Sequence, residues 1–460
     1  MIQLTDEQWA QNQEEIRQLR EQVKELKEHI QELTSHLQKA QERIAELESP
    51  EKEPPSFVKA DVPPKEKKER KKRAPEHNRA RRCEAPTEIV EHTLERCPDC
   101  HGRVSSVFVG RTRQVIEIPE PQPIIIREHR IERGWCSYCQ QWKEAAVDLS
   151  QEVRGKSRVG NRLSALIVEL RSIFRLPIRQ IQTWLDIHYG LEVSIGEISE
   201  ITTRVAQAGV QEYAAIRQQI QTSPVVHADE TSWRESGKNG YIWLAMTPEG
   251  ATYFEYHHSR AGEVIEKLLG EDFHGILETD FYAGYNHTPG GKHQRCWVHL
   301  LRDLHKLKVK HQKTKYALEL QIWVGAIHAL YLRAKQVASH PDESFRRRKV
   351  KQLHMELHAL ADQFREQEDH PAQTLAKRIV RFIGELLLFV VHPQVTPDNH
   401  RAERTIRPLV IARKISSGTR SSLGSQTRMI LASLTATWRS SSLSVFDQCV
   451  HLLQTPLPQV

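Results

Sequence analysis

The feature that most constrains this chain is a succession of short apolar runs that begins after Pro224. The strand patterns cover 225–231, 241–247, 252–256 and 275–281, and a helical pattern covers 261–269. Three strands, a helix and a fourth strand are the opening of a ribonuclease H-like α/β fold. In such a sheet the first and fourth strands are neighbours, so Asp229 and Asp280, which lie at those two strands, are expected to converge.

A third carboxylate is expected on a helix further along the chain. The segment 396–398, Thr-Pro-Asp, predicts an N-cap followed by proline at the first helical position. Asn399 and Glu403 then lie four residues apart on one helix face, where Glu403 can face the two aspartates. Three carboxylates in one pocket repel one another unless divalent cations neutralise them, so Asp229, Asp280 and Glu403 predict two catalytic Mg²⁺ ions, with Mn²⁺ as the alternative. Two such ions support in-line phosphoryl transfer.

Spacing alone does not choose between neighbouring acids. Glu230 follows Asp229 directly, and Glu278 shares a strand face with Asp280 because side chains alternate with a period of two. Either glutamate could therefore be the ligand, and any single acid is more often a solvated surface charge.

The N-terminal segment carries a sustained heptad pattern. The a positions are Ile16, Val23, Ile30, Leu37 and Ile44, and the d positions are Leu19, Leu26, Leu33, Ala40 and Leu47. Mostly β-branched residues at a and leucine at d favour a parallel two-stranded coiled coil, which predicts a homodimer. The alternative is an amphipathic helix that folds back on the core of its own chain.

A basic block follows the heptads. Prolines interrupt a charged stretch that cannot bury enough apolar surface to order itself, which predicts a disordered linker. Lys65 to Arg82 holds ten Lys or Arg against three Glu, which equals the net charge of +7 of the whole chain. This excess predicts contact with double-stranded DNA, with Arg79, Arg81 and Arg82 as candidate residues. A solvated spacer is the alternative.

Two Cys-x-x-Cys pairs, Cys97 with Cys100 and Cys136 with Cys139, predict one structural Zn²⁺ bound by four thiolates. Strand-like alternation at 104–109, 115–118 and 124–131 predicts a small β-rich module around this ion. Buried reduced thiols are the alternative. Seven cysteines are too few and odd in number for a secreted disulfide framework.

The rest of the chain reads as helical. Apolar spacings broken near Pro177 and Gly190 predict a helix-turn-helix-like DNA-binding region, with plain structural helices as the alternative. The longest apolar run, Leu386 to Val391, is far shorter than the roughly 20 residues of a membrane helix, so we expect a cytoplasmic protein without a membrane partner.

Together these patterns predict a multidomain α+β protein. Its parts are a coiled-coil helix at 1–48, a basic linker at 49–86, a zinc-binding module at 87–150, a helical DNA-binding region at 151–222, a catalytic core at 223–440 with a helical insertion at about 310–392, and a C-terminal helix and tail at 441–460.

Several short motifs, in their order, resemble a known family. They are His227-Ala-Asp-Glu-Thr231, Thr279-Asp-Phe-Tyr-Ala-Gly-Tyr285, Cys296-Trp-Val-His299, Asn399-His-Arg-Ala-Glu-Arg404 and Ile406-Arg-Pro-Leu409. The ordered set is similar to the IS66 type of bacterial insertion-sequence transposase, and the resemblance covers nearly the whole chain.

The resemblance implies that Asp229, Asp280 and Glu403 form a DDE triad, in preference to Glu230 and Glu278. It implies an enzyme that binds terminal inverted repeats and catalyses strand cleavage and strand transfer. Accessory proteins of the same element are further candidate partners. The rival functions are a catalytically inactive transposase-derived DNA-binding protein and a metal-dependent DNA nuclease on the same fold.

Residues around the third acid are further candidates. Asn399 matches the polar residue before the glutamate in the family pattern and would orient a ligand or phosphate. His299 matches the histidine of the family's Cys-Trp-x-His segment, which we interpret as a buried strand end feeding a helix. Arginines among small hydroxyl residues suit close approach to a phosphate backbone, and the DNA-contact candidates are Arg404, Arg407, Arg413 and Lys414.

Overall fold

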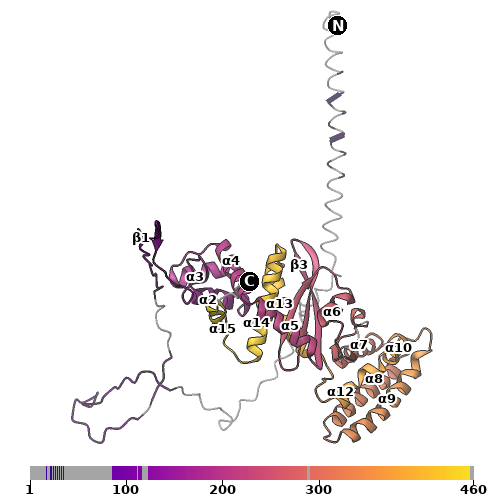
Figure 1. Cartoon of the computed structure of the whole chain (residues 1–460). Helices are drawn as coiled ribbons and strands as arrows, with labels where there is room; N and C mark the ends of the chain where they lie inside the picture. The colour runs from indigo at the N-terminus through magenta and orange to yellow at the C-terminus, as the bar shows by residue number, and fades with distance from the viewer. Residues whose placement is uncertain are drawn as a thin grey trace, which may run out of the picture. The chain divides into compact units, whose positions relative to one another are not determined.

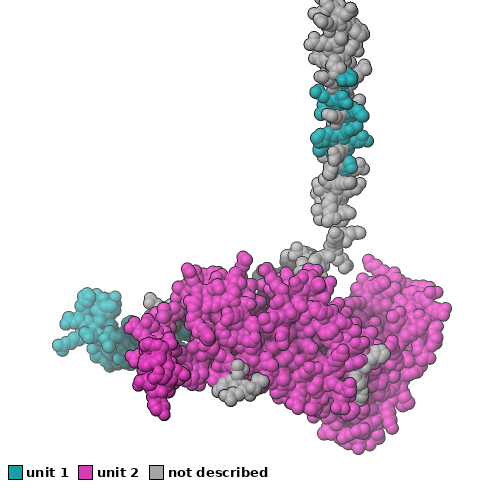
Figure 2. All heavy atoms as spheres, turned by 45° about the horizontal axis from the view of Figure 1, so that its top comes forward, with its two compact units in different colours: residues 1–117 teal, residues 118–460 magenta. Residues whose placement is uncertain are grey.

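The computed structural model describes 85–110, 112–116, 123–286, 288 and 291–455, together with scattered residues between Arg17 and Ser35. The chain divides into two compact units, residues 1–117 and residues 118–460 (Figure 2). Each unit is described by itself.

In the first unit, the described residues between Arg17 and Ser35 are helical, and the d-position side chains of Leu26 and Leu33 are exposed. A pairing helix needs such an uncovered seam. The a positions of the heptads and the basic residues Arg79, Arg81 and Arg82 lie outside the described residues, so the homodimer and the basic linker remain predictions.

The strands expected near the first cysteine pair do not form. The described residues at 104–109 and 124–131 are not in strands, although Arg96 and Arg103 form an isolated bridge. The expectation was wrong because alternation supplies only side-chain pattern, whereas a strand also needs a neighbour for its backbone N–H and C=O groups. In the second unit, strands β1 (Arg133–Cys136) and β2 (Gln141–Glu144) form an antiparallel hairpin that brackets the second cysteine pair.

In the described part of the second unit, four helices precede the sheet. They are α2 (Asn161–Ser172), α3 (Ile178–Tyr189), α4 (Ile195–Ala208) and α5 (Val210–Thr222). Pro177 starts α3 and Gly190 ends it in the left-handed conformation, which confirms the predicted breaks. Ser194 caps α4 by accepting a hydrogen bond from the Glu197 amide. Helices α2, α3 and α4 enclose an apolar cluster of their own.

A mixed sheet forms the centre of the second unit (Figure 1), and its strand order is β5-β4-β3-β6-β7. The strands are β3 (Val225–Glu235), β4 (Lys238–Met246), β5 (Thr252–His257), β6 (Ile276–Thr279) and β7 (Lys292–Arg295), and the connections contain α6 (Gly262–Leu269) and η2 (Ala283–Tyr285). Strands β3, β4 and β5 are antiparallel, whereas β6 is parallel to β3 and β7 is parallel to β6. The first and fourth strands are therefore neighbours, as the sequence predicts.

Alternation along the strands gives the sheet two buried faces. On one face, residues such as Val226 and Trp243 pack against α5, α6 and α14 (Ser422–Ser440). On the other face, Ile242 and Leu244 pack against Ala402 of α13 (His400–Ser416). The C-terminal helix α15 (Val445–Gln454) packs against α2.

Helices fill the region between β7 and α13. They are α7 (Trp297–Lys310), α8 (Ala317–Ala338), α9 (Glu343–Arg365), α10 (Gln373–Arg381), α11 (Ile383–Leu386) and α12 (Leu388–Val391). This confirms a helical insertion, which gathers beside the sheet in Figure 1. Its apolar core continues into Val225 and Ile276 of the sheet. No helix in the described part of the chain is long and apolar enough to span a membrane.

We predict that Leu244→Ala destabilises the sheet, because Leu244 is fully buried beneath α13. The free energy of unfolding should fall by about 2–5 kcal/mol, measured by urea denaturation followed by tryptophan fluorescence. The control is Leu332→Ala on α8, where the leucine is 47% exposed. The control should change the free energy by less than about 0.5 kcal/mol. Equal losses for the two variants would contradict the packing described for α13.

Candidate active site

The register of the sheet brings Asp229 and Asp280 to the same face. In the parallel pair of β3 and β6, His227 lies opposite Glu278. Asp229 follows His227 by two residues within β3, so its side chain lies on the face of that pair, and Asp280 directly follows the last residue of β6, close enough to Asp229 for their charges to interact. This is also the face that α13 covers, and Glu403 lies in the first turn of α13. The structure therefore gathers the three predicted acids.

The surroundings of Asp229 show that the acids influence one another. Burial raises the pKa of Asp229 to about 8, and the nearby charges of Glu230, Asp280 and Glu403 act in the same direction. A hydrogen bond from the Glu230 amide to Oδ1 of Asp229, at 2.9 Å, opposes the rise in pKa. A buried carboxylate among other carboxylates favours a bound cation or a proton.

One carboxylate oxygen of Glu403 has no hydrogen bond within the described part of the chain. This atom, Oε1, is buried, and Nε2 of His299 lies 3.6 Å from it. A buried carboxylate oxygen without a donor is costly. The oxygen donors of Asp229, Asp280 and Glu403 fit a hard divalent cation. Among the described residues, however, no three His, Cys, Asp or Glu side chains are already arranged to hold one ion.

Glu230, the first alternative acid, lies on the opposite face of β3. Arg260 donates to its Oε1 from Nε at 3.0 Å and from Nη2 at 2.5 Å, and the Tyr285 hydroxyl donates to its Oε2. Burial raises the pKa of Glu230, and these hydrogen bonds oppose the rise. Its charge is therefore already paired within the protein.

Glu278, the second alternative acid, holds the segment before α13 by hydrogen bonds. The Thr396 amide and hydroxyl donate to its carboxylate at 2.9 and 2.5 Å, and Nδ1 of His227 lies 3.3 Å away. Burial raises the pKa of Glu278 to about 8, and the hydrogen bonds from Thr396 oppose this rise. The expected N-cap at 396–398 is wrong, because Thr396 binds Glu278 and the helix begins only at His400, with Asn399 as N-cap.

Asn399 is buried and holds the start of α13 in place. Its Nδ2 donates to the Ala228 carbonyl of β3 at 2.7 Å, and its backbone amide donates to Sγ of Cys296 at 3.3 Å. Cys296 is buried at the end of β7 and caps α7, which confirms the interpretation of 296–299 as a strand end feeding a helix. The amide of Trp297 adds a bond to the Pro397 carbonyl at 2.9 Å.

The basic residues after Glu403 divide into two groups. Arg413 donates to the Thr231 hydroxyl at 3.1 Å and to the carbonyl and hydroxyl of Ser232, so it ties α13 to β3. Arg404, Arg407 and Lys414 are exposed on α13. Their spacings of three and seven residues place them along one side of the helix.

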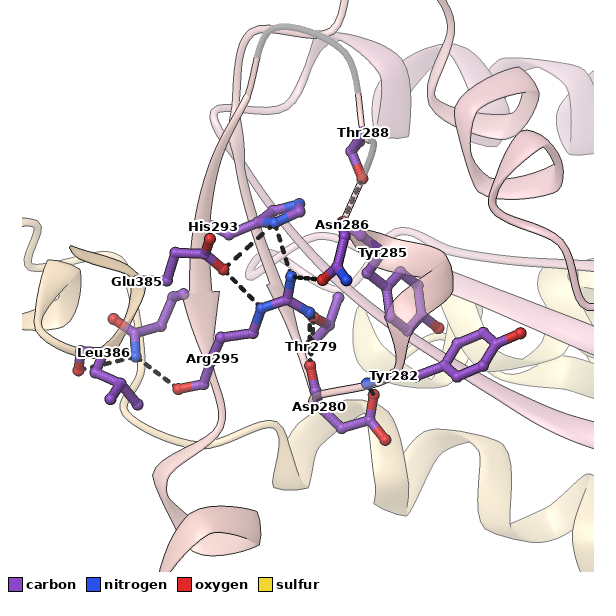
Figure 3. A network of polar contacts seen from close by, with 11 residues as sticks. Thr279, Asp280, Tyr282, Tyr285, Asn286, Thr288, His293, Arg295, Glu385 and Leu386 are labelled. Carbon is purple, nitrogen blue, oxygen red and sulfur yellow. Dashed lines mark hydrogen bonds and ion pairs between the residues drawn. The ribbon is translucent and has the colours of Figure 1, made fainter. Parts of the chain in front are cut away.

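The sequence patterns do not predict one part of the site, strand β7 with Arg295 at its end. Lys292-His-Gln-Arg295 is polar throughout, yet it forms β7, and Arg295 donates from Nη1 to the Asp280 carbonyl at 2.9 Å (Figure 3). The ion pair of Arg295 with Glu385 joins residues far apart in the chain, which no local pattern predicts.

Each cysteine pair lies at a turn of the backbone. Hydrogen bonding from the backbone of Cys100 is the largest of the effects that hold the pKa of the Cys97 thiol below its usual value, and the backbone of Cys139 does the same for Cys136. The Cys139 amide donates to Sγ of Cys136 at 3.4 Å. Such donors favour the thiolate that Zn²⁺ requires.

The second unit is a mixed α/β fold whose five-stranded sheet and neighbouring acids are compatible with a DDE transposase core. Comparison with protein families identifies it further. The model of the transposase IS66 family matches residues 156–427, more than half of the chain, and the chain therefore belongs to this family. No curated protein matches the chain. Membership indicates a transposase role with DNA as partner, and DDE transposases use divalent metal ions.

Proposed function

We propose that the chain is a DNA transposase that binds the terminal inverted repeats of an insertion sequence and catalyses strand cleavage and strand transfer. The observation that supports this most directly is the division of the acids. Asp229, Asp280 and Glu403 share one face, whereas Glu230 and Glu278 are committed to partners within the fold.

In this proposal Asp229, Asp280 and Glu403 hold two Mg²⁺ ions, or Mn²⁺ in their place. Bound metal would activate the attacking oxygen and stabilise the leaving oxygen of a phosphodiester. The protein orients two of the carboxylates through backbone amides, because Glu230 donates to Asp229 and Tyr282 donates to Asp280 at 2.8 Å.

Contact with DNA is assigned to the exposed side of α13. Arg404 and Arg407 lie within about one turn of Glu403 on the same helix, and Lys414 lies about three turns beyond it, so phosphates held by them would run a strand along α13 past Glu403. The N-terminal region would add a homodimer through the coiled coil, phosphate contacts by the basic linker and a structural Zn²⁺ at the four cysteines. A helix-turn-helix-like role of α2 to α4 completes the proposed DNA-binding surface.

The triad is tested with purified full-length protein, Mg²⁺ and a labelled duplex that carries the end of the element. Asp229→Asn should lower the nicking rate at least about a hundredfold, since even the outer partners of metal ligands commonly contribute ten- to a hundredfold. Binding of the duplex should persist. Chelation of the metal should abolish nicking by the unmodified protein.

The matched control is Glu230→Gln, one residue along the same strand but on the other face. It should lose less than about tenfold in rate, since it lacks the metal role assigned to its neighbour. Nicking without strand transfer would favour the nuclease alternative, and binding without nicking would favour the inactive DNA-binding protein. Equal losses in the two variants would contradict the choice of Asp229.

The exposed arginines are tested by the salt dependence of DNA binding. If Arg404 and Arg407 each neutralise one phosphate, changing both to alanine should reduce the slope of log K against log salt concentration by about 1.8. Arg413→Ala should leave this slope unchanged, because its guanidinium is held by Thr231 and Ser232. Affinities measured between 50 and 200 mM salt, on end and unrelated duplexes, decide between these outcomes.

The zinc proposal predicts about one Zn²⁺ per chain by elemental analysis. Because one ion would need both pairs, Cys97→Ser and Cys136→Ser should each remove it. Cys449→Ala is the control, since Cys449 is buried in the helical core and burial raises its pKa to about 12. Retention of metal in both serine variants would contradict a shared four-cysteine site.

A further inference from the structure

Arg295 is a fully buried cation at the end of β7 (Figure 3), with 0% of its side chain exposed. A buried guanidinium is costly unless its donors are satisfied. Here Nε and both terminal nitrogens have acceptors. These are Glu385 Oε2 at 2.7 Å, Thr279 Oγ1 at 3.2 Å, the Asp280 carbonyl at 2.9 Å, Asn286 Oδ1 at 2.8 Å and His293 Nδ1 at 3.3 Å.

On one side, Arg295 holds the backbone that carries Asp280. Strand β6 ends at Thr279, where the Cys296 amide donates to the Thr279 carbonyl at 2.9 Å. Asp280 therefore lies beyond the ladder of the sheet, and its carbonyl accepts hydrogen bonds from Nη1 of Arg295 and from the Thr279 hydroxyl, each at 2.9 Å. The same nitrogen donates to the Thr279 hydroxyl, so the Arg295 side chain extends the hydrogen bonding of the sheet by one residue beyond β6.

On the other side, Arg295 is held by the helical insertion. Glu385 belongs to α11, and Nδ1 of His293 on β7 lies 3.7 Å from the same carboxylate oxygen. Gln294 strengthens this junction, because it donates to the Leu386 carbonyl at 3.3 Å and accepts from the Phe389 amide at 3.0 Å. The insertion is thus hydrogen-bonded to β7 next to Arg295, the residue that contacts the end of β6.

The Phe382 ring also restrains the plane of the Arg295 guanidinium. It stacks over the Phe382 ring with 4.9 Å between its central carbon and the ring centroid. Phe382 in turn contacts Phe281, the residue after Asp280, with ring centroids 5.6 Å apart. A planar fork that is bonded on three sides and stacked on a ring has one available orientation.

We propose that Arg295 is a positioning residue for Asp280 and that Glu385 fixes its orientation, so that the helical insertion sets the geometry of the metal site. This inference rests on the proposed function of Asp280 as a metal ligand. It assigns the insertion a role in metal binding in addition to any contact with DNA.

The test measures Mn²⁺ affinity of the full-length protein by electron paramagnetic resonance, together with the Mg²⁺ dependence of nicking. Arg295→Lys keeps the charge but loses the fork, and it should weaken Mn²⁺ binding about tenfold, the scale seen for partners that orient metal ligands. Glu385→Gln should weaken binding in the same direction by a smaller factor. The double variant should be no weaker than Arg295→Lys alone, because the two residues act as one unit.

The matched control is Glu356→Gln. Glu356 forms an ion pair with Arg333 inside the insertion, and its side chain is 32% exposed, as is that of Glu385. It should leave Mn²⁺ affinity and nicking unchanged. Melting temperatures of all variants separate a loss of folding from a loss of positioning, and Glu385→Gln provides the test on its own if Arg295→Lys fails to fold.

Wild-type Mn²⁺ affinity in folded Glu385→Gln, or an equal loss in Glu356→Gln, would overturn the inference while leaving the proposed function in place. If the unmodified protein and Asp229→Asn bind Mn²⁺ equally, the metal role of the triad fails, and the inference fails with it.

Discussion

The position of Glu403 depends on how the start of α13 is bonded to the sheet. Glu278 accepts two hydrogen bonds from Thr396, and Asn399 donates to the Ala228 carbonyl of β3. Without these buried contacts the start of the helix would be located mainly by apolar packing, and such packing tolerates small shifts along the axis. Hydrogen bonds are directional, so they define the start of α13 closely enough for its first turn to face Asp229.

The sheet also separates acids that are adjacent in sequence. Asp229 and Glu230 point to opposite faces, and each face gives its acid a different role. Glu230 accepts hydrogen bonds from Arg260 and Tyr285, whereas Asp229, among the described residues, accepts one from a backbone amide and lies near further acids. The same fold thus contains a buried carboxylate that is paired by donors of the protein and one whose charge a bound cation or a proton would neutralise.

The strand alternation and the helical spacings predict the core, because the neighbouring positions of β3 and β6 follow from local patterns. The choice of Asp229 over Glu230 required the family resemblance, since spacing fits both. Thr396 could not be placed correctly from sequence because its partner Glu278 lies 118 residues earlier. Strand β7 was missed for a similar reason: its polar side chains have buried partners on the insertion, so they give no apolar alternation.

The position of the insertion in the sequence also determines the order in which the residues of the site are synthesised. Asp280 and Glu403 are separated by 122 residues, and the insertion between them shares its apolar core with the sheet through Val225 and Ile276. At about 5–20 residues per second, a ribosome needs roughly 6–24 s to pass from one acid to the other. Both aspartates and the helices of the insertion are therefore made before Glu403, so a nascent chain lacks the third acid until the core shared by the insertion and the sheet has been able to form.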